Sequence, residues 1–337
     1  MAKKRTPMHS RKGPSKSIKI TSYKKLKRVA GSFANGEYGN VIIVGPPGVG
    51  KTVHIRWAVQ EATGGHYAYL NNHATPFGFY TMLWHFQDMP LIIDDIKAIN
   101  SNPASVGLLM AVTDSSRPKA ITWTSKTCTP YTEPPSWFET ESNVAIITNQ
   151  WDTLDERVKA LEDRCMCFHF VPTPAAIHAY VGTWFDDQEI YDWMGPRIFQ
   201  VRQPSIRSYL HAKKLRDTGA KDWQDDASQL VGVDRELGLV IQLELSKLKP
   251  DEKMEAFMDI TKKSKATYYR LRQLALDNMP DGGQDLELPA TKLTGVGRMP
   301  VLVNAQPTNI SPDMIEEIAA ILAGATTDQE ATQQAEA

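Results

Sequence analysis

The sequence predicts an α/β protein built on a parallel sheet with helices on both of its faces. Between residues 21 and 172, short apolar segments of strand length alternate with longer segments of helical apolar period, which is the order typical of doubly wound sheets. A glycine-rich loop, GPPGVGKT at 45–52, joins the first apolar segment to the helix that follows it. Its G-x-x-x-x-G-K-T spacing is that of phosphate-binding α/β proteins.

The predicted elements follow one another in a regular order. A helix is expected over residues 21–36, where Thr21 or Ser22 would cap it and Gly36 would end it. Apolar segments predict strands at 40–45, 66–72, 90–96, 120–125, 143–150 and 165–171. Segments of helical period predict helices at 53–65, 77–87, 102–115 and 155–164. The Pro-rich residues around the fourth of these strands predict a loop or hairpin insertion at 117–142.

Composition limits the class of protein. The net charge is −1, but the first 28 residues hold eleven Lys/Arg and no Asp/Glu, whereas residues 281–337 hold nine acids and two bases. Three cysteines are too few for a disulfide scaffold and suit a reducing compartment. Because no apolar run approaches the about 20 residues that a membrane span needs, we expect a cytoplasmic protein without membrane contact.

Changes in composition and period predict five regions. The basic, turn-rich start of the chain predicts a disordered arm, and after residue 172 the alternation of strands and helices gives way to helices alone. The expected boundaries are an arm at 1–20, an α/β nucleotide-binding domain at 21–172, a helical segment at 173–220, a second helical domain at 221–280 and an acidic, mostly disordered tail at 281–337.

The loop at 45–52 predicts a site for ATP and Mg²⁺. Glycines let backbone N–H groups close around a phosphate, and the N-terminus of the next helix adds partial positive charge. Lys51 would reach the β- and γ-phosphates, and the Thr52 hydroxyl would bind Mg²⁺. The predicted nucleotide-binding residues are Gly45, Pro46, Pro47, Gly48, Val49, Gly50, Lys51 and Thr52.

Two adjacent acids, Asp94 and Asp95, end the apolar segment PLIIDDI. Strand ends in an open α/β sheet face the ligand crevice, so these carboxylates are expected near the phosphates. Asp94 is the predicted partner of Mg²⁺, directly or through water. Asp95 is placed to orient and polarise the attacking water, unless it caps a helix or forms an ion pair.

The succession of phosphate loop, LIIDD, NVAIITNQ and KALEDRCMCFHF resembles AAA+ ATPases over about residues 22–215. The last of these segments is similar to clamp-loader and replication-initiator members, and the chain as a whole to phage or mobile-element members. The resemblance implies a homo-oligomer, as a ring or open ring, a helical lid at 173–220, and the host cytoplasm for a phage-encoded chain. It also assigns three roles: Asn149 as the γ-phosphate sensor, with Thr148 as second choice, Arg164 as the arginine that reaches a neighbouring subunit's nucleotide, and Arg207 as the lid sensor.

Asp95 departs from the pattern of this family, in which the second acid is usually glutamate. Aspartate is one methylene shorter, so its carboxylate would lie about 1 Å further from the water, and a misplacement on that scale can cost about 10²-fold in rate. An arginine supplied across a subunit interface is worth about 10³–10⁵ in rate. We therefore expect slow hydrolysis by the monomer and faster hydrolysis after assembly.

Two segments indicate DNA as a partner. One is the basic arm, which could contact phosphates without reading sequence. The other, residues 254–276, resembles a helix-turn-helix with a turn near 260–263 and a second helix capped by Ser264. Ala266, Tyr269 and Leu271 or Leu274 are expected to pack inward. The residues predicted to contact DNA are Lys262, Lys263, Lys265, Thr267, Arg270 and Arg272.

Several alternatives stay open at this point. The segment 254–276 also reads as a helical hairpin with a solvated basic face. The insertion around Trp123, Lys126 and Tyr131 either touches DNA in the pore of a ring, or Trp123 and Trp137 pack it onto the core. The favoured function is a DNA-acting ATPase of replication-initiator, helicase-loader or transposition-helper type. The alternatives are a protein-remodelling ATPase and a nucleotide-switched DNA-binding regulator with little turnover, and a short predicted helix at 312–324 offers a site for a protein partner.

Overall fold

The structure is a computed structural model that describes residues 13–71, 74–95, 102–125, 128–151, 159–219 and 221–279. The chain divides into two compact units, Met1–Pro172 and Thr173–Ala337. The division falls after the residue predicted to end the α/β domain. The predicted tail at 281–337, with its helix at 312–324, lies outside the described residues, as do residues 1–12 of the arm.

The first unit contains a six-stranded sheet in the order β1-β8-β2-β7-β4-β3, and all of its neighbouring strands are parallel. The predicted α/β fold is therefore confirmed, with the strands ordered as in P-loop NTPases. Its elements are β1 (Ile18–Ile20), α1 (Tyr23–Ala34), β2 (Val41–Val44), α2 (Lys51–Thr63), β3 (Ala68–Asn71), α3 (Pro76–His85), β4 (Leu91–Asp94), α5 (Pro103–Val112), β5 (Lys119–Thr122), β6 (Trp137–Thr140), β7 (Val144–Thr148), a 3₁₀ helix η2 (Ala160–Asp163) and β8 (Met166–Phe170).

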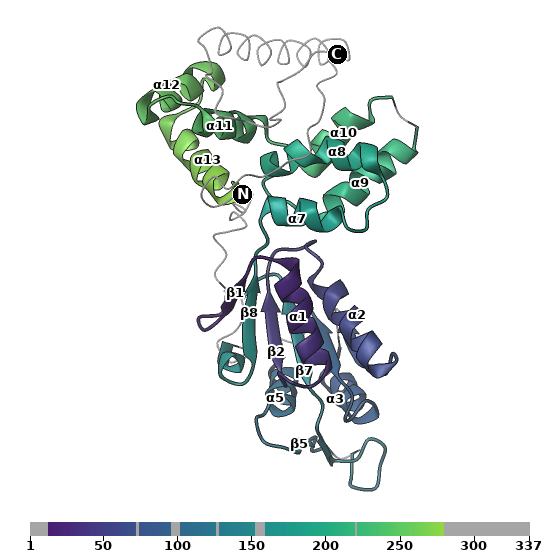
Figure 1. Ribbon diagram of the computed structural model, residues 1–337. Coiled ribbons are helices and arrows are strands. Elements are labelled where there is room, and N and C mark those ends of the chain that lie inside the picture. Colours follow the sequence, from purple (N-terminus) through teal and green to yellow (C-terminus); the bar gives the residue numbers. More distant parts are fainter. Residues whose placement is uncertain are drawn as a thin grey trace, which may run out of the picture. The chain divides into compact units, whose positions relative to one another are not determined.

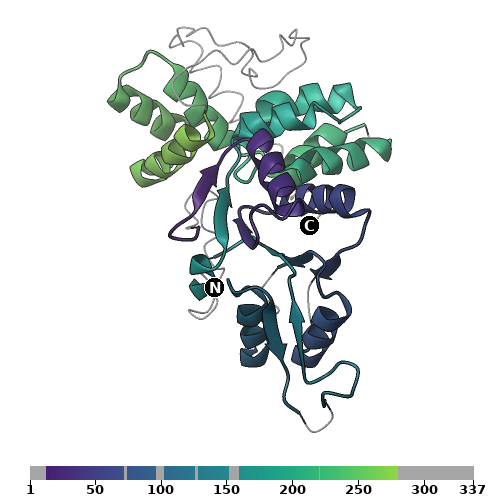
Figure 2. The ribbon, with the colours of Figure 1, turned by 60° about the horizontal axis from the view of Figure 1, so that its bottom comes forward.

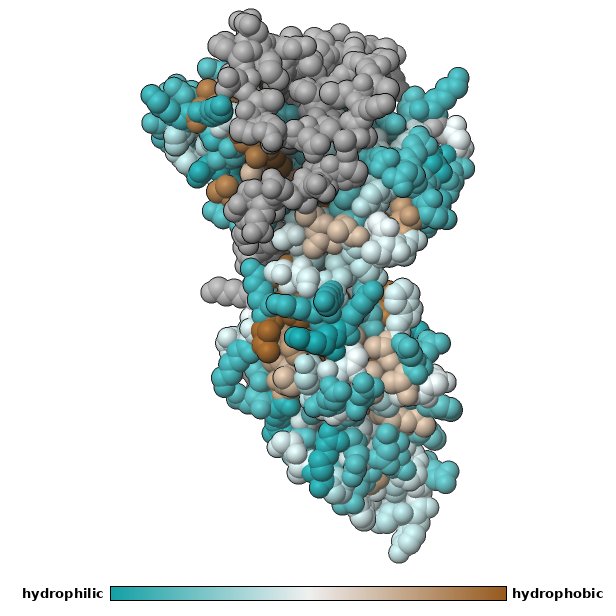
Figure 3. Space-filling view, viewed as in Figure 1, coloured by the Kyte–Doolittle hydropathy of each residue, from teal (hydrophilic) through white to brown (hydrophobic). Residues whose placement is uncertain are grey.

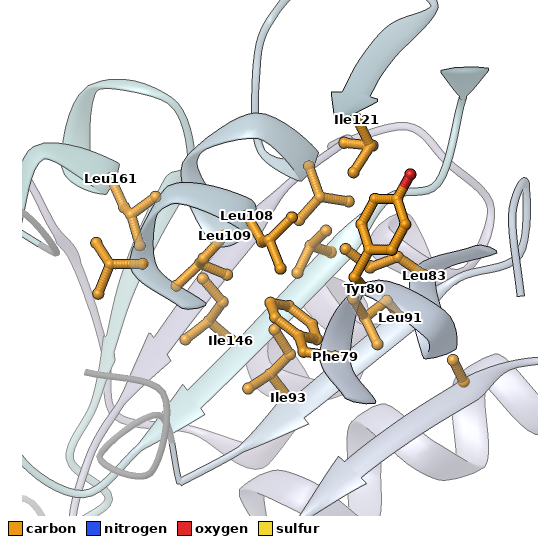
Figure 4. Close-up of a cluster of buried hydrophobic side chains, with 14 of the residues drawn as sticks. Phe79, Tyr80, Leu83, Leu91, Ile93, Leu108, Leu109, Ile121, Ile146 and Leu161 are labelled. Atoms are coloured by element: carbon orange, nitrogen blue, oxygen red, sulfur yellow. The ribbon is translucent and has the colours of Figure 1, made fainter. Parts of the chain in front are cut away.

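The central strands are buried on both faces, which is why they read as continuous apolar runs. On one face, alternate residues such as Ile93 and Ile146 join a core cluster with Phe79 and Tyr80 of α3 and Leu109 of α5 (Figure 4). The other face is covered by α1 and α2, which pack against each other (Figures 1 and 2). The packing of α1 on α2 holds α2 against the sheet, and the phosphate loop joins the end of β2 to the start of α2.

The helix α1 buries one stripe and exposes another. Leu26, Val29 and Phe33 are buried at helical spacing, and the Ser22 side chain caps the helix by accepting a hydrogen bond from the Lys25 backbone N–H. The exposed stripe holds the basic residues Lys24, Lys25, Lys27 and Arg28. Figure 3 shows the corresponding face of α1 as hydrophilic.

The insertion contains an antiparallel hairpin formed by β5 and β6. Trp123 packs against Phe77 and Tyr80, with ring centroids 5.8 Å apart in both pairs. Trp137 behaves differently, because 54% of its surface is exposed. The packing alternative thus holds for Trp123 and not for Trp137.

The prediction that the whole of 1–20 is a disordered arm is wrong for its last residues. Ile18–Ile20 form β1, which pairs in parallel with β8, and Ile20 is buried. The Ser15 hydroxyl and backbone N–H donate to the carboxylate of Glu162. β-branched residues at this end favour a strand, and the edge of β8 supplies the hydrogen-bond partners that the local composition does not reveal.

The expected helix at 155–164 is described only in part. Residues 152–158 lie outside the described residues, and Ala160–Asp163 form the 3₁₀ helix η2 rather than an α-helix. Leu161 alone is buried among these four residues.

The second unit is helical throughout its described residues, as predicted. Its elements are α7 (Pro174–Val181), α8 (Gln188–Arg197), η3 (Ile198–Gln200), α9 (Ile206–Asp217), α10 (Trp223–Val231), α11 (Arg235–Leu245), α12 (Pro250–Thr261) and α13 (Lys265–Asn278). Among the described residues, no helix has the length and apolar character to cross a membrane.

A buried histidine ties α7 to α8 and α9. The His178 ring stacks on Tyr191, with centroids 4.0 Å apart, and its Nδ1 is 2.8 Å from the Tyr209 hydroxyl. Burial lowers the pKa of His178 to about 4, because the charged ring would lose its hydration. His178 is therefore neutral at pH 7 and contributes to the packing of the helical unit.

This histidine predicts a loss of stability in acid. Between pH 6.5 and about 4 the unfolded chain binds a proton that folded His178 does not, so the free energy of unfolding falls as the pH drops through that window, by at most about 3 kcal/mol. Urea denaturation at several pH values, with hydrogen exchange assigning the transition to the helical unit, measures this slope.

His178→Phe keeps an aromatic ring against Tyr191 and removes the titrating group, so the slope between pH 4 and 6.5 should shrink. His211, which is exposed on α9, provides the control: His211→Gln should leave the slope as in the wild type. A His178→Phe variant with an unchanged slope would contradict this account.

Candidate nucleotide site and basic helix

The loop between β2 and α2 has the backbone that a phosphate site needs. Gly48 and Gly50 have φ values of 76° and 86°, in the left-handed region that favours glycine. At Gly45 an added Cβ would lie 2.2 Å from the Phe170 carbonyl oxygen, so only glycine fits there. Gly50 has no side chain to cap α2, so the N–H groups of the first turn keep their capacity for an anion.

The structure brings the predicted Lys51 and Asn149 together. Lys51 is buried, and its ammonium donates to the carbonyl oxygens of Gly45 and Pro46 at 2.8 and 2.7 Å. It also donates to Asn149 Oδ1 at 3.0 Å. Asn149 follows β7, the strand next to β2, so an amide and an ammonium lie at the same end of neighbouring strands.

Thr52 and Asp94 form the second predicted contact. The Thr52 hydroxyl donates to Asp94 Oδ2 at 3.0 Å. Thr52 lies in the first turn of α2, and Asp94 ends β4, so the contact joins a helix to the strand beneath it. A hydroxyl beside a carboxylate is a donor set that suits Mg²⁺, which prefers oxygen ligands.

Asp95 is held in an unusual conformation. Its φ is 62°, in the left-handed region that non-glycine residues rarely adopt. Its backbone N–H donates to the Ile147 carbonyl at 3.0 Å. Among the described residues, its buried Oδ1 has no hydrogen-bond partner. A strained residue with an unsatisfied buried carboxylate oxygen is typical of a functional site, and it fits a bound cation or water.

Of the two predicted arginines, Arg164 is not part of this cluster. Arg164 donates to the Met110 carbonyl at 2.8 Å and to Asp114 Oδ2 at 3.0 Å, so its guanidinium lies at the end of α5 in its own chain. Arg207 is exposed in the first turn of α9, within the helical unit. Their proposed roles in a neighbouring subunit and in the lid stay predictions.

Sequence reasoning missed Tyr69, which also contacts Asp94. Its hydroxyl donates to Asp94 Oδ2 at 3.1 Å. Burial, followed by the charge of Asp94, raises the pKa of Tyr69, so the hydroxyl keeps its proton. The only sequence signal was that Tyr69 lies in a strand that could pair with β4, and the pairing itself is a tertiary fact.

A second candidate site lies in the three-helix group of α11, α12 and α13, where α13 packs on α11. Lys262 ends α12 with φ 54°, and Ser264 caps α13. Tyr268, Leu271, Leu274 and Ala275 face inward. Ala266 and Tyr269, predicted to pack inward, are exposed. Leu271 and Leu274 are thus buried as predicted, whereas Tyr268 takes the inward place predicted for Tyr269 and packs against Phe257 of α12, at 5.5 Å between ring centroids.

The predicted basic residues of this group differ in their surroundings. Lys263 forms an ion pair with Glu236, and Arg272 donates to Glu244 Oε1 at 2.9 Å. Both are therefore engaged in ion pairs in this structure, and their contact with DNA stays a prediction. Thr267 interacts with the cap, its hydroxyl 3.1 Å from the Ser264 hydroxyl. The predicted bases that remain exposed outside those two ion pairs are Lys262, Lys265 and Arg270.

No protein-family model and no curated protein sequence matches the chain. Solved structures do match, at low sequence identity. The Thermotoga maritima RuvB Holliday junction branch migration motor has 13% identity and a TM-score of 0.42, and the match covers 76% of this chain and 87% of that one.

Two further solved structures are similar. A DNA replication initiation factor has 12% identity and a TM-score of 0.38, with 78% of this chain and 84% of that chain covered. A DNA polymerase III gamma subunit-related protein from Thermotoga maritima has 11% identity and a TM-score of 0.33, with 75% and 97% covered. These likenesses concern the arrangement of helices and strands only.

The two adjacent aspartates predict opposite effects on stability. In Asp95→Gly, the left-handed backbone and the unpaired buried oxygen are relieved, so the free energy of unfolding without ligand should rise by about 1 kcal/mol. In Asp94→Gly, two hydrogen bonds and a strand side chain are lost, so it should fall by about 1–3 kcal/mol. Urea denaturation of both variants checks this. A loss of stability in Asp95→Gly equal to that in Asp94→Gly would contradict the strain assigned to Asp95.

Proposed function

We propose that this protein binds and hydrolyses ATP as an AAA+ type ATPase that acts on DNA. The observation that carries the ATPase proposal is the convergence of Lys51, Thr52, Asp94 and Asn149 at the carboxyl ends of three neighbouring parallel strands. An ammonium, a hydroxyl, a carboxylate and an amide are the groups that phosphoryl transfer requires, since catalysis there depends on positioning and charge.

Thr52 and Asp94 are the residues that would hold Mg²⁺, with Asp94 acting directly or through water. A bound Mg²⁺ supplies charge that stabilises the phosphates during transfer. The loop at 45–50 would hold the phosphates through backbone N–H groups, and Lys51 would exchange its loop carbonyl partners for phosphate oxygens. Asn149, already 3.0 Å from Lys51 Nζ, would report the γ-phosphate.

Asp95 is the proposed residue that orients the attacking water. Support comes from its buried Oδ1, which has no partner among the described residues. The left-handed backbone directs this side chain away from the course that a regular strand would give it. Because aspartate is short for this role, hydrolysis by one subunit alone is expected to be slow.

Arg164 is the proposed contribution of one subunit to its neighbour's site. In its own chain it pairs with Asp114 at 3.0 Å. Both side chains are more than one third exposed, at 34% for Arg164 and 41% for Asp114. Exposed pairs of this kind are weak, so Arg164 could exchange Asp114 for a phosphate at small cost. The completed site is therefore proposed to lie at a subunit interface of a homo-oligomer.

DNA is the proposed substrate because of the charge distribution on α12 and α13. Lys262, Lys265 and Arg270 are exposed outside the ion pairs of Lys263 and Arg272, whereas α12 exposes Asp251, Glu252, Glu255 and Asp259. Lys265 and Arg270 lie on the outward stripe of α13 together with the small Ala266, which would allow close approach to a duplex. An exposed basic stripe on the second helix of such a pair is what DNA phosphates and base edges would meet.

The ATPase proposal is tested by turnover with and without DNA for the wild type, Lys51→Ala and Arg164→Ala. Lys51→Ala should lose activity because the phosphates lose their ammonium partner. Arg164→Ala should lose the activity gained on assembly, which we expect to be about 10³-fold or more. Asp114→Ala is the matched control, since it removes the intramolecular partner and keeps the guanidinium. Equal activity of monomer and oligomer, together with an inert Arg164→Ala, would refute the interface site.

The DNA proposal is tested by a mobility-shift titration at several salt concentrations. Lys265→Glu/Arg270→Glu should weaken binding at least about tenfold and lower the salt dependence by about two phosphate contacts. Lys214→Glu/Lys221→Glu, exposed on α9 and the turn after it, changes the net charge equally and should bind like the wild type. Unchanged binding by the α13 variant would remove DNA from the proposal.

A further inference from the structure

The strand pairing beside the nucleotide site places Tyr69 on the same face of the sheet as Asp94. In the parallel register of β3 and β4, Tyr69 pairs with Ile92 and Asn71 pairs with Asp94. Residues two apart in a strand share a face, so Tyr69 and Asp94 are diagonal neighbours. The helix α2 packs on this same face and contacts β4.

One turn of α2 separates the two residues that complete this group. Thr52 and Arg56 are four residues apart and therefore lie on the same side of the helix. The Thr52 hydroxyl donates to Asp94 Oδ2 at 3.0 Å, and the Arg56 guanidinium lies over the Tyr69 ring, 4.5 Å from its centroid. Arg56 also donates from Nε to the Tyr67 hydroxyl at 3.3 Å.

Two hydroxyls thus converge on one carboxylate oxygen. Tyr69 donates to Asp94 Oδ2 at 3.1 Å, and Thr52 donates to the same atom. Tyr69 is half-buried, and Arg56 holds its ring by a cation–π contact. The phenol is therefore held at both ends, by the guanidinium over the ring and by the carboxylate at the hydroxyl.

We infer that Tyr69 is a positioning residue that fixes the Asp94 carboxylate for a divalent cation bound with the nucleotide. The inference rests on the proposed function of Thr52 and Asp94 and extends it to β3. Arg56 acts one step further out by holding the Tyr69 ring. Neither residue touches the nucleotide in this assignment, and both act through Asp94.

The physical reason is the geometry that Mg²⁺ demands. This ion accepts only near-ideal octahedral coordination, so a carboxylate that rotates freely binds it poorly, whether the contact is direct or through water. Outer hydrogen bonds that orient a ligand are typically worth 10–100-fold in metal affinity. The hydrogen bond from the Tyr69 hydroxyl to Asp94 is of this kind. It comes from β3, a strand at the edge of the sheet that is separate from the phosphate loop.

The test measures metal binding without turnover. Full-length protein is titrated with Mn²⁺ in the presence of ADP, and electron paramagnetic resonance of free Mn²⁺ reports how much metal is bound. Tyr69→Phe removes one hydroxyl and keeps the ring under Arg56. We expect about a tenfold or greater loss of Mn²⁺ affinity, with ADP binding in the absence of metal unchanged and a fall in the urea midpoint smaller than that of Asp94→Gly, which loses both hydrogen bonds at this carboxylate.

Tyr67→Phe is the matched control. It removes an identical hydroxyl two residues away, which contacts Arg56 and not Asp94, and it should bind Mn²⁺ like the wild type. If Tyr69→Phe bound Mn²⁺ as tightly as the wild type, or if Tyr67→Phe lost as much affinity, the assignment of Tyr69 would be overturned.

The failure of this inference differs from the failure of the proposed function. A wild-type protein that retained neither ADP nor Mn²⁺ with ADP would overturn the nucleotide site itself, and the Tyr69 assignment with it. A wild type that retains both, beside a Tyr69→Phe variant that behaves identically, would overturn only the role of Tyr69.

Discussion

The parallel register of β2, β7 and β4 is the constraint on which the candidate site depends. Val44 pairs with Thr148, Asp94 pairs with Ile147, and the Gly45 N–H donates to the Thr148 carbonyl at 3.2 Å. Because these strands run in the same direction, the residues that follow them reach one edge of the sheet. A shift of β4 by a single residue would turn Asp94 to the other face and separate it from Thr52.

The two aspartates at this edge have opposite effects on the stability of the folded state. Asp94 accepts hydrogen bonds from two hydroxyls and so contributes to the folded state as well as to the proposed metal site. Asp95 has a left-handed backbone and a buried oxygen without a partner among the described residues. Such costs persist where the surrounding structure over-determines the conformation. Here the buried strand before Asp95 and the hydrogen bond of its N–H to Ile147 provide that determination.

The basic helix α13 shows where sequence reasoning reached its limit. Its existence and its Ser264 cap were predictable, because a cap and a helical period are local signals. The inward positions of Leu271 and Leu274 were predicted, but Tyr268 rather than Tyr269 packs on Phe257. The ion pairs of Lys263 and Arg272 could not be foreseen, because Glu236 and Glu244 belong to α11. A charge count from sequence therefore overstated the basic surface.

The sequence by itself determined the α/β class, the phosphate loop, the acid pair after a buried strand and the polar residue after the next one. All of these depend on apolar period, glycine spacing and neighbours along the chain. Only the tertiary structure decided that Ile18–Ile20 join the sheet, that Lys51 meets Asn149 and that Tyr69 meets Asp94. Those contacts join strands and helices far apart in the sequence, and a hydrogen bond between such residues exists only once strand order and register have been set.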